Sequence, residues 1–324
     1  MTIALSVFFD AAYLEPALVT AFDVIKAGLH PNVHKLYLVY LKKSAEVDHE
    51  VAAILQSFAV KFSVHIPVVA ISVTNSLGEL SSHHFNNSII YKGIVPTLIP
   101  TEQFILNIDA GILVGGLFGE FIRRIKVDYC GAEQNWVVAA HCNPTGDGIP
   151  QALASHSRHA MYPAGNLLLF NADRYASHRW IERYLRNYSE MGAHLEYAEQ
   201  ELICLTAAES ELISLPGIEL RQMEFLGLNV LLGEEPLSIP DLRDKLIYKV
   251  VGSLKPWKYW VLDPRKAIYT RKRAELEAEF PLSGNRLIEA ERMLCSREDY
   301  WIGFLKAYDR YTQYLPHQPE ATLP

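Results

Sequence analysis

Cysteine is scarce in this sequence, and no run of apolar residues is long enough to cross a bilayer. The 324 residues include four widely spaced cysteines without a C-x-x-C pair, namely Cys130, Cys142, Cys204 and Cys295. This spacing argues against a zinc cluster or a disulfide scaffold and suits a reducing compartment. The first apolar run, Ile3–Phe9, ends at Asp10 and is too short for a transmembrane span or a signal peptide. We therefore expect a cytoplasmic protein.

A surplus of positive charge is also lacking. The chain carries 30 Lys and Arg against 37 Asp and Glu, a formal net charge of −7. Because nucleic-acid backbones are bound by clustered Lys and Arg, we expect no nucleic-acid partner. The sequence has no internal repeat and no low-complexity segment. With 50% of its residues hydrophobic, the chain can bury one large core, or one core with a small appended unit.

Short apolar runs alternate with helical patterns in the first half of the chain. The expected strands are Ile3–Phe9, Lys35–Leu41, Phe62–Val69, Phe104–Ile108, Asn135–Ala140 and Asn166–Phe170. The expected helices are Glu15–Gly28, Ala45–Phe58 and Asp173–Glu190, the last capped by Asp173. This alternation predicts an α/β sheet with parallel strands covered on both faces. Ligands of such sheets bind beyond the carboxyl ends of the strands, where Asp10 and Asp109 are expected to lie.

The last part of the chain is charged and helical in pattern. About three helices are expected across Asp263–Tyr314, with a break at Pro281–Asn285. An aromatic stripe at helical spacing comprises Tyr300, Phe304, Tyr308 and Tyr311. We expect this stripe to pack the last helix onto the domain. The alternative is peripheral contact of the C-terminal helices with a partner or with the inner face of a membrane.

Six short segments, met in a fixed order, can together form a ligand site. They are Val7–Tyr13, Ser88–Pro96, Phe104–Val114, Tyr162–Asn171, Tyr197–Ile203 and Lys249–Trp257. The last segment ends in Gly-x-x-Lys-Pro-Trp, a combination that is rare by chance. In order and spacing these segments resemble the donor-site motifs of the family 8 glycosyltransferases, which include bacterial lipopolysaccharide galactosyl- and glucosyltransferases and glycogenin-like enzymes. The resemblance covers about four fifths of the chain, from residue 3 to 260.

The resemblance implies an α/β fold of the GT-A type. Its nucleotide-sugar-binding domain, with a mixed and mostly parallel sheet, would span residues 1–260. A C-terminal helical extension over 261–315 and a disordered tail over 316–324 complete the predicted organisation.

Residue roles follow from the same resemblance. The implied donor-binding residues are Asp10, Tyr13, Tyr91, Lys92, Asp109, Gly165, Lys249, Gly252 and Lys255, and the implied catalytic residues are Gln200 and Glu199. Asp10 and Tyr13 would hold the base, since a carboxylate accepts from a uracil N–H and a phenol ring stacks on the base. Gln200 would lie nearest the reacting carbon, where its amide oxygen stabilises positive charge. A structural alternative stays open, because Asp10 and Glu199 can also serve as helix caps.

The sequence departs from the family pattern at four positions. Gly93 stands in place of an Arg, Gly111 in place of the second Asp of Asp-x-Asp, Pro163 in place of an Asn, and Lys249 in place of a metal-binding His. Asp109 is thus the one metal ligand that remains, and an Mn²⁺ or Mg²⁺ site there is degenerate. We hypothesise that Lys249, with Lys255, neutralises the leaving diphosphate, and that Asp109 serves the donor ribose or pairs with a lysine.

The function implied by the resemblance is hexosyl transfer with retention of configuration, in polysaccharide or lipopolysaccharide biosynthesis. The donor would be a UDP-linked sugar and the acceptor a saccharide or glycolipid. One alternative is a catalytically decayed nucleotide-sugar-binding protein. Another is a sugar nucleotidyltransferase, but Phe8–Pro16 lacks the glycines and basic residues that hold a triphosphate in such enzymes.

Overall fold

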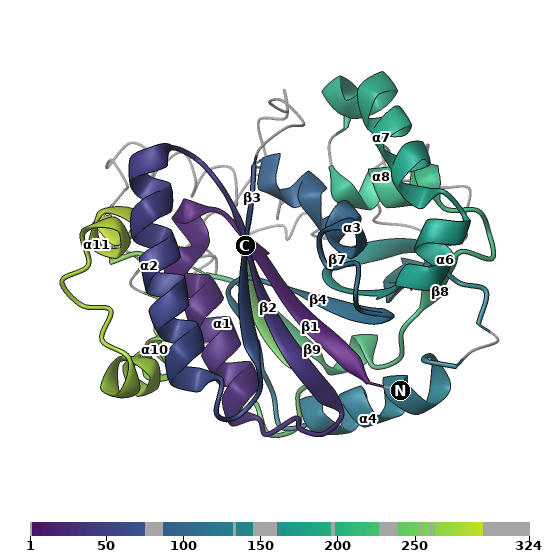
Figure 1. Ribbon diagram of the computed structural model, residues 1–324. Coiled ribbons are helices and arrows are strands. Elements are labelled where there is room, and N and C mark those ends of the chain that lie inside the picture. The colour runs from purple at the N-terminus through teal and green to yellow at the C-terminus, as the bar shows by residue number, and fades with distance from the viewer. Residues whose placement is uncertain are drawn as a thin grey trace, which may run out of the picture. The chain divides into compact units, whose positions relative to one another are not determined.

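A mixed sheet of seven strands forms the centre of the fold (Figure 1). The computed structural model describes residues 2–74, 87–131, 134–144, 161–195, 198–226, 239–252, 254–259, 261 and 263–293. The chain divides into two units, of which the first comprises Met1–Gln222 with Leu242–Tyr248 and the second Met223–Asp241 with Lys249–Pro324.

The sheet belongs to the first unit and has the strand order β3-β2-β1-β4-β7-β6-β8. Its strands are β1 (Ile3–Phe9), β2 (Val33–Leu41), β3 (Val68–Val73), β4 (Phe104–Asp109), β6 (Val138–Pro144), β7 (Met161–Asn171) and β8 (Leu212–Ser214). Neighbouring strands run parallel except β7, which is antiparallel to both β4 and β6. The prediction of a mixed, mostly parallel sheet is therefore confirmed.

Strand β1 shows why these segments extend. All seven of its residues are buried, so the strand reads as one continuous apolar run rather than an alternation. Its one polar side chain, Ser6, donates a hydrogen bond to Asn107 Oδ1 on the neighbouring β4 at 3.1 Å. Pairing the two buried polar groups avoids the cost of leaving either unsatisfied.

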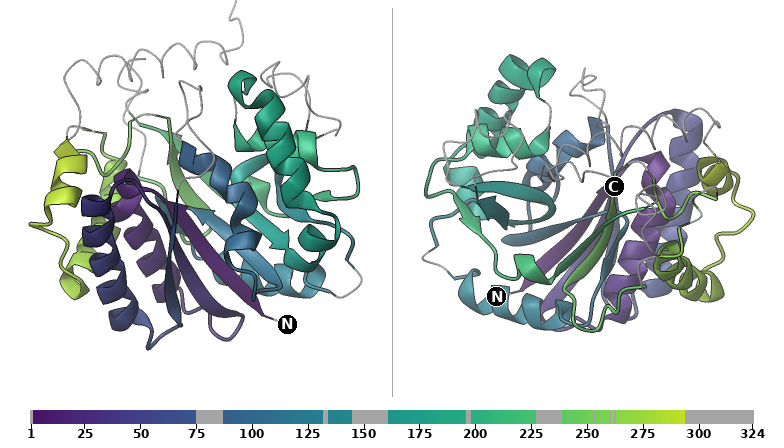
Figure 2. Two further views of the ribbon diagram at one scale, coloured as in Figure 1. Left: turned by 45° about the horizontal axis from the view of Figure 1, so that its top comes forward. Right: turned by 180° about the vertical axis from the view of Figure 1, so that it is seen from behind.

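Helices cover this sheet (Figures 1 and 2). They are α1 (Leu14–Lys26), α2 (Ala45–Phe62), α3 (Val95–Leu98), α4 (Phe118–Asp128), α6 (Ala172–Ser177), α7 (Trp180–Met191) and α8 (Glu199–Thr206), with short 3₁₀ helices η1 (Ala11–Tyr13), η2 (Asn87–Ile94), η3 (Gly192–His194) and η4 (Ile218–Leu220). Helix α1 packs on β1 and β2, α2 packs on β3, and α8 packs on β7 and η2.

Several predicted boundaries differ from the structure, and two of the differences have identifiable reasons. The third strand begins at Val68 rather than Phe62, because Phe62 continues the buried stripe of α2 formed with Leu55 and Phe58. The helix expected over Asp173–Glu190 is two helices, separated where Arg179 adopts a left-handed φ of 51°.

The cap of the first of these two helices is also corrected. Asn171 caps α6, since its Oδ1 accepts from the backbone N–H of Arg174 at 3.3 Å, whereas Asp173 lies inside the first turn. Asp173 there accepts a hydrogen bond from Gln103 Nε2 at 2.8 Å instead.

The remaining elements include a small sheet with the order β5-β10-β9. Its strands are β5 (Ile112–Val114), β9 (Arg221–Phe225) and β10 (Ile247–Val251). The second unit contains α10 (Lys266–Glu279) and α11 (Arg286–Met293), which fall within the predicted helical extension. The expected third helix, its aromatic stripe and the tail over 316–324 lie outside the described residues. In the described part of the chain, no helix is long and apolar enough to span a membrane.

Candidate functional site

The two acidic strand ends lie at one edge of the main sheet. Strands β1 and β4 are parallel, and Phe8 of β1 stands opposite Asp109, the last residue of β4. Asp10 follows β1 by one residue, so both carboxylates belong to the carboxyl edge, as the sequence predicted. Both residues are buried.

Asp10 caps the short helix that follows β1. Its Oδ1 accepts a hydrogen bond from the N–H of Ala12 at 3.0 Å. The structural alternative, a helix cap, is thus realised. The cap occupies one carboxylate oxygen and fixes the turn that carries Tyr13 at the end of η1, where the phenol is half-buried. A role of both residues in binding a base remains a prediction.

A buried lysine lies between two carboxylates at this edge. Lys92, in η2, forms an ion pair with Asp109, and its Nζ lies 3.6 Å from Oε1 of Glu199, the first residue of α8. The three side chains are at most 10% exposed. Burial by itself lowers the pKa of Lys92, but the negative charges of Asp109 and Glu199 outweigh it and raise that pKa above its usual value. The ammonium therefore stays charged, and we call Lys92, Asp109 and Glu199 the acid–lysine cluster.

The backbone around Glu199 is adapted to its carboxylate. A Cβ atom placed on Gly165 of β7 would lie 2.1 Å from Glu199 Oε1, so glycine is the residue that leaves room for this oxygen. Ala198, fully buried just before α8, has a φ of 46° that a non-glycine residue rarely adopts. Strain of this kind persists where the surroundings impose it, and it is concentrated at functional sites. Gln200 follows Glu199 and is half-exposed.

Gly93 is explained by packing rather than by a ligand. A Cβ atom on Gly93 would lie 2.2 Å from Cζ of Tyr184, whose hydroxyl donates to the carbonyl of Ile90 at 3.0 Å. A side chain longer than that of glycine does not fit at position 93. The positive charge of this segment is therefore carried by Lys92. The neighbouring Tyr91 is 1% exposed and stacks on Phe8 with ring centroids 5.8 Å apart. Tyr91 thus anchors η2 in the core.

The residues at this edge do not fit a divalent cation. Gly111 has a φ of 86°, and its N–H donates to Thr20 Oγ1 at 2.9 Å, so the turn after β4 offers no second carboxylate. Asp109, the remaining ligand of the predicted metal site, is engaged by the Lys92 ammonium. Among the described residues, no group of three His, Cys, Asp or Glu side chains is placed to hold a metal ion.

The described residues of the Gly-x-x-Lys-Pro-Trp segment belong to the second unit. Gly252, directly after β10, has a φ of 77°, which favours glycine. Lys255 Nζ donates to the carbonyl of Val250 at 3.1 Å and lies 5.7 Å from the ring centroid of Trp257. Trp257 is buried against Tyr269. Lys249 is half-exposed on β10. Contact of Lys249 and Lys255 with a diphosphate stays a prediction.

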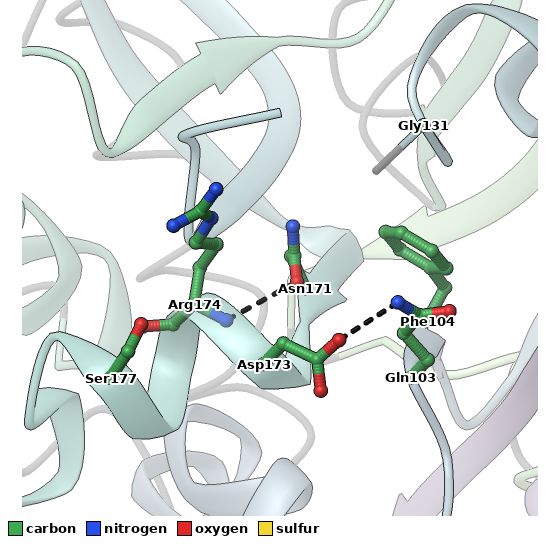
Figure 3. A pocket seen from close by; sticks show the side chains of 7 residues that line it. All are labelled: Gln103, Phe104, Gly131, Asn171, Asp173, Arg174 and Ser177. Atoms are coloured by element: carbon green, nitrogen blue, oxygen red, sulfur yellow. Dashed lines mark hydrogen bonds between the residues drawn. The ribbon is translucent and has the colours of Figure 1, made fainter. Parts of the chain in front are cut away.

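A pocket elsewhere in the first unit does not coincide with the predicted site. It is lined by Gln103, Phe104, Gly131, Asn171, Asp173, Arg174 and Ser177 (Figure 3). Gln103 and Phe104 lie at the amino end of β4, whereas Asp109 ends that strand at the opposite edge. The Gln103–Asp173 hydrogen bond crosses this pocket and ties β4 to α6.

Sequence reasoning assigned Lys92, Asp109 and Glu199 to one donor site and offered a lysine as a partner of Asp109, but it did not predict that this lysine is Lys92 or that Glu199 lies beside it. It also missed Ala198 and Tyr184, which shape the backbone on either side. No periodic signal marks either residue, because a left-handed alanine and a tyrosine beneath a glycine are consequences of tertiary packing.

Solved structures share this fold, although neither a family model nor a curated protein matches the chain. The galactosyltransferase LgtC, in complex with donor and acceptor sugar analogs, is 17% identical with a TM-score of 0.56, covering 86% of this chain and 100% of its own. The fold is that of a GT-A-type glycosyltransferase. WbbM, a bifunctional glycosyltransferase, is 15% identical with a TM-score of 0.57 over 86% of this chain and 51% of its own.

A third neighbour is the glycosyltransferase GlyE of Streptococcus pneumoniae TIGR4. It is 14% identical with a TM-score of 0.54, and the match covers 84% of this chain and 60% of GlyE. At such low identities the similarity establishes the fold.

Proposed function

We propose that this protein is a retaining hexosyltransferase that moves a sugar from a UDP-linked donor to a saccharide or glycolipid acceptor. The observation that supports this proposal most is the acid–lysine cluster, in which segments far apart in the sequence converge at the carboxyl edge of the sheet. Ligands of α/β sheets bind at this edge. The similarity to LgtC, whose structure contains donor and acceptor sugar analogs, supports the same class of substrate.

The proposed chemistry assigns a role to each side chain at the edge. Asp10 and Tyr13 hold the base, and the carboxylates of Asp109 and Glu199 accept hydrogen bonds from ribose or sugar hydroxyls. Gln200 directs its amide oxygen at the anomeric carbon, where positive charge develops as the bond to the diphosphate oxygen breaks. The diphosphate leaves with the electron pair, the acceptor oxygen bonds to the same face, and the acceptor proton passes to the leaving group.

In this proposal transfer proceeds without a divalent cation. Lys249 and Lys255 supply the positive charge that neutralises the leaving diphosphate. Opposite unit charges about 4 Å apart interact by about 4 kcal/mol at an intermediate effective dielectric. Two lysines together therefore offset a large part of the charge that develops on the diphosphate.

A thermal-shift screen of nucleotide sugars, repeated with MnCl₂ and with EDTA, tests the donor and the metal requirement together. A UDP-hexose at about 100 times its Kd should stabilise the protein by about 2.7 kcal/mol. Hydrolysis of the hit is then measured with and without acceptor, for the wild type and for Lys249→Ala. Absence of a shift with every nucleotide sugar contradicts the proposal, and a shift without turnover favours the decayed binding protein. Activity that EDTA abolishes and Mn²⁺ restores contradicts metal independence.

The site of action remains a sequence-based prediction. A cytoplasmic enzyme that meets a lipid-linked acceptor at the inner face of a membrane would use its last helices, whose aromatic stripe lies outside the described residues. Binding to vesicles with and without anionic lipid, compared for the full chain and for Phe304→Ser, tests this expectation. Equal binding by both proteins contradicts it.

A further inference from the structure

We propose that Lys92 is the resident cation of the site, whose ammonium occupies the position between Asp109 and Glu199 that a divalent ion would need and so prevents such an ion from binding. In this proposal, Lys92 of the first unit, which lies next to the two acids, is the residue that makes the site independent of a metal ion. It adds to the proposed role of Lys249 and Lys255 at the diphosphate. Its meaning for sugar transfer rests on the proposed function, whereas ion binding is measured on the free protein.

The geometry supports the inference directly. The Lys92 ammonium contacts Asp109 and lies 3.6 Å from Glu199 Oε1, so one cation bridges two carboxylates from different elements. Mg²⁺ and similar ions bind proteins through one or two carboxylates, and the Lys92 ammonium already lies between Asp109 and Glu199. An ion bound there would lie in contact with the ammonium, and the repulsion between the two cations in a buried site would be large.

The lysine has no alternative position nearby at low cost. Its side chain is 10% exposed, and η2 is fixed beneath it by the stack of Tyr91 on Phe8 and by the Tyr184 hydrogen bond to Ile90. Moving the ammonium aside would take a positive charge away from two buried carboxylates, which is strongly destabilising. The ammonium is therefore held in place by the two acids.

The arrangement also explains two departures from the family pattern. With an ammonium on Asp109, a second carboxylate at position 111 has no ion to bind, and the left-handed turn at Gly111 is free to use glycine. Lys92 is also the chain neighbour of Gly93, where the packed Tyr184 ring excludes an arginine. Lys92 thus supplies, from the adjacent position, a positive charge that the glycine cannot carry.

The test titrates the free protein with MnCl₂ and follows unbound Mn²⁺ by electron paramagnetic resonance. Wild type is expected to bind no Mn²⁺ with a Kd below about 1 mM. Lys92→Met, which keeps the chain length without the charge, should bind at least about tenfold more tightly. Adding Asp109→Asn to that variant should remove the gain. Lys272→Met, which breaks an exposed pair with Glu275 and changes the net charge equally, is the matched control and should behave as wild type.

Each outcome decides the inference. Tight Mn²⁺ binding by wild type overturns it, and so does a folded Lys92→Met protein that binds no more tightly than wild type. If Lys92→Met does not fold, the same comparison is made with Lys92→Gln, whose amide can hydrogen-bond to a carboxylate. Mn²⁺ should also raise the Tm of the Lys92 variants but not that of wild type. Failure of the proposed function is separate, since it would appear as the absence of nucleotide-sugar binding by wild type.

Discussion

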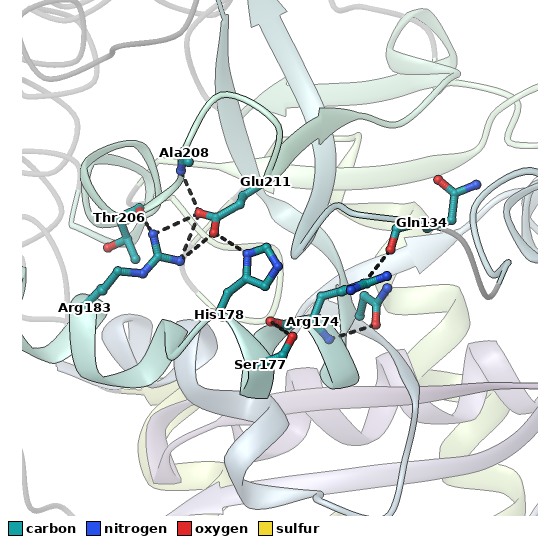
Figure 4. Close-up of polar contacts among 9 residues, drawn as sticks. Gln134, Arg174, Ser177, His178, Arg183, Thr206, Ala208 and Glu211 are labelled. Atoms are coloured by element: carbon teal, nitrogen blue, oxygen red, sulfur yellow. Dashed lines mark hydrogen bonds and ion pairs between the residues drawn. The ribbon is translucent and has the colours of Figure 1, made fainter.

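Two buried ion clusters in the first unit have opposite compositions. In one, a single carboxylate, Glu211, is surrounded by donors: Arg183 Nη2 at 2.8 Å, His178 Nδ1 at 2.6 Å and the N–H of Ala208 at 2.7 Å (Figure 4). In the acid–lysine cluster a single ammonium serves two carboxylates. The first places several donors around one acid, and the second places one ammonium between two acids.

The difference separates an anchor from a candidate site. Glu211 lies directly before β8. It binds Arg183 of α7, His178 between α6 and α7, and Ala208 after α8. Each of its bonds is made to the protein, so it stabilises the fold and has little to offer a ligand. The acid–lysine cluster lies instead at the carboxyl edge, and carboxylates are acceptors that suit the hydroxyl donors of a sugar.

Removing the acid from each cluster should give the largest and most contrasting effects. Glu211→Gln leaves Arg183 without its counter-charge and should lower the free energy of unfolding by about 3 kcal/mol. This value of about 3 kcal/mol is at the lower end for a buried pair, since the side chains of Arg183 and His178 are about a third exposed. Nucleotide-sugar binding should be unchanged. Urea unfolding and thermal shift measure the two quantities.

Glu199→Gln should show the reverse. Lys92 still pairs with Asp109, and the repulsion between the two carboxylates is relieved, so the free energy of unfolding should change by less than about 1 kcal/mol. Sugar transfer should fall at least about a hundredfold, the effect of losing one well-placed polar group. A large loss of stability with normal transfer would make this cluster an anchor like that of Glu211.

A single added methyl group tests the packing around the acid–lysine cluster. Gly165→Ala places a Cβ atom against Glu199 Oε1 and should lower the free energy of unfolding by about 2 kcal/mol, with a loss of transfer as the carboxylate is displaced. Gly119→Ala is the control, because its Cβ atom would meet Leu29 at an ordinary 3.8 Å. If both substitutions are equally mild by urea unfolding and in the transfer assay, the contact at Gly165 is unimportant.

The two clusters should respond to opposite ends of the pH scale. Burial alone raises the pKa of Glu211, but the Ala208 N–H, His178 and Arg183 outweigh it and hold that pKa below its usual 4.5. The contribution of Glu211 is therefore present above pH 4.5 and is lost as pH falls through the lower folded value. The raised pKa of Lys92 makes its contribution complete below 10.5 and lost as pH rises through the higher folded value.

Thermal unfolding across the pH range measures this asymmetry. Glu211→Gln should flatten the acid side of the stability profile, and Lys92→Met should flatten the alkaline side. Identical profiles for wild type and either variant on the corresponding side would contradict the assignment of that cluster.

The smallest expected effect comes from restoring an acid at position 111. Gly111→Asp must adopt a φ of 86° and should cost about 1 kcal/mol of unfolding free energy, with no gain in Mn²⁺ affinity while Lys92 is present. Gly28→Asp, at a φ of 65° with open space around it, imposes similar strain elsewhere and serves as the control. Tight Mn²⁺ binding by Gly111→Asp alone would show that the lysine does not exclude the ion.

Much of the fold could be predicted where one local signal dominates. The continuous apolar run Ile3–Phe9 gave β1 with both ends correct, and Asp109 was expected at the end of a buried strand. The third strand was misplaced because Phe62 fits an apolar strand as well as the buried stripe of α2. Tertiary packing on the sheet, not propensity, decides between the two.

The candidate site was predicted as a set of positions with a lysine as one possible partner of Asp109, but that lysine was not identified. Asp10 and Asp109 followed from parallel strands ending at one edge, a property of chain direction that the sequence pattern carries. Gly165 was expected to approach a donor sugar, and the structure shows Glu199 in close approach to it. Lys249 was expected to compensate for the missing ion. That role stays a prediction.

The sequence by itself determined that a carboxylate ends β4 and that the second ligand position after it is a glycine. Only the tertiary structure decided which charge meets that carboxylate. Folding brings η2 and α8 over the same edge, and burial makes the contact between Lys92 and two acids far stronger than it would be in water. Such a contact has no sequence period, because it joins side chains that are distant in the chain and adjacent only in the folded protein.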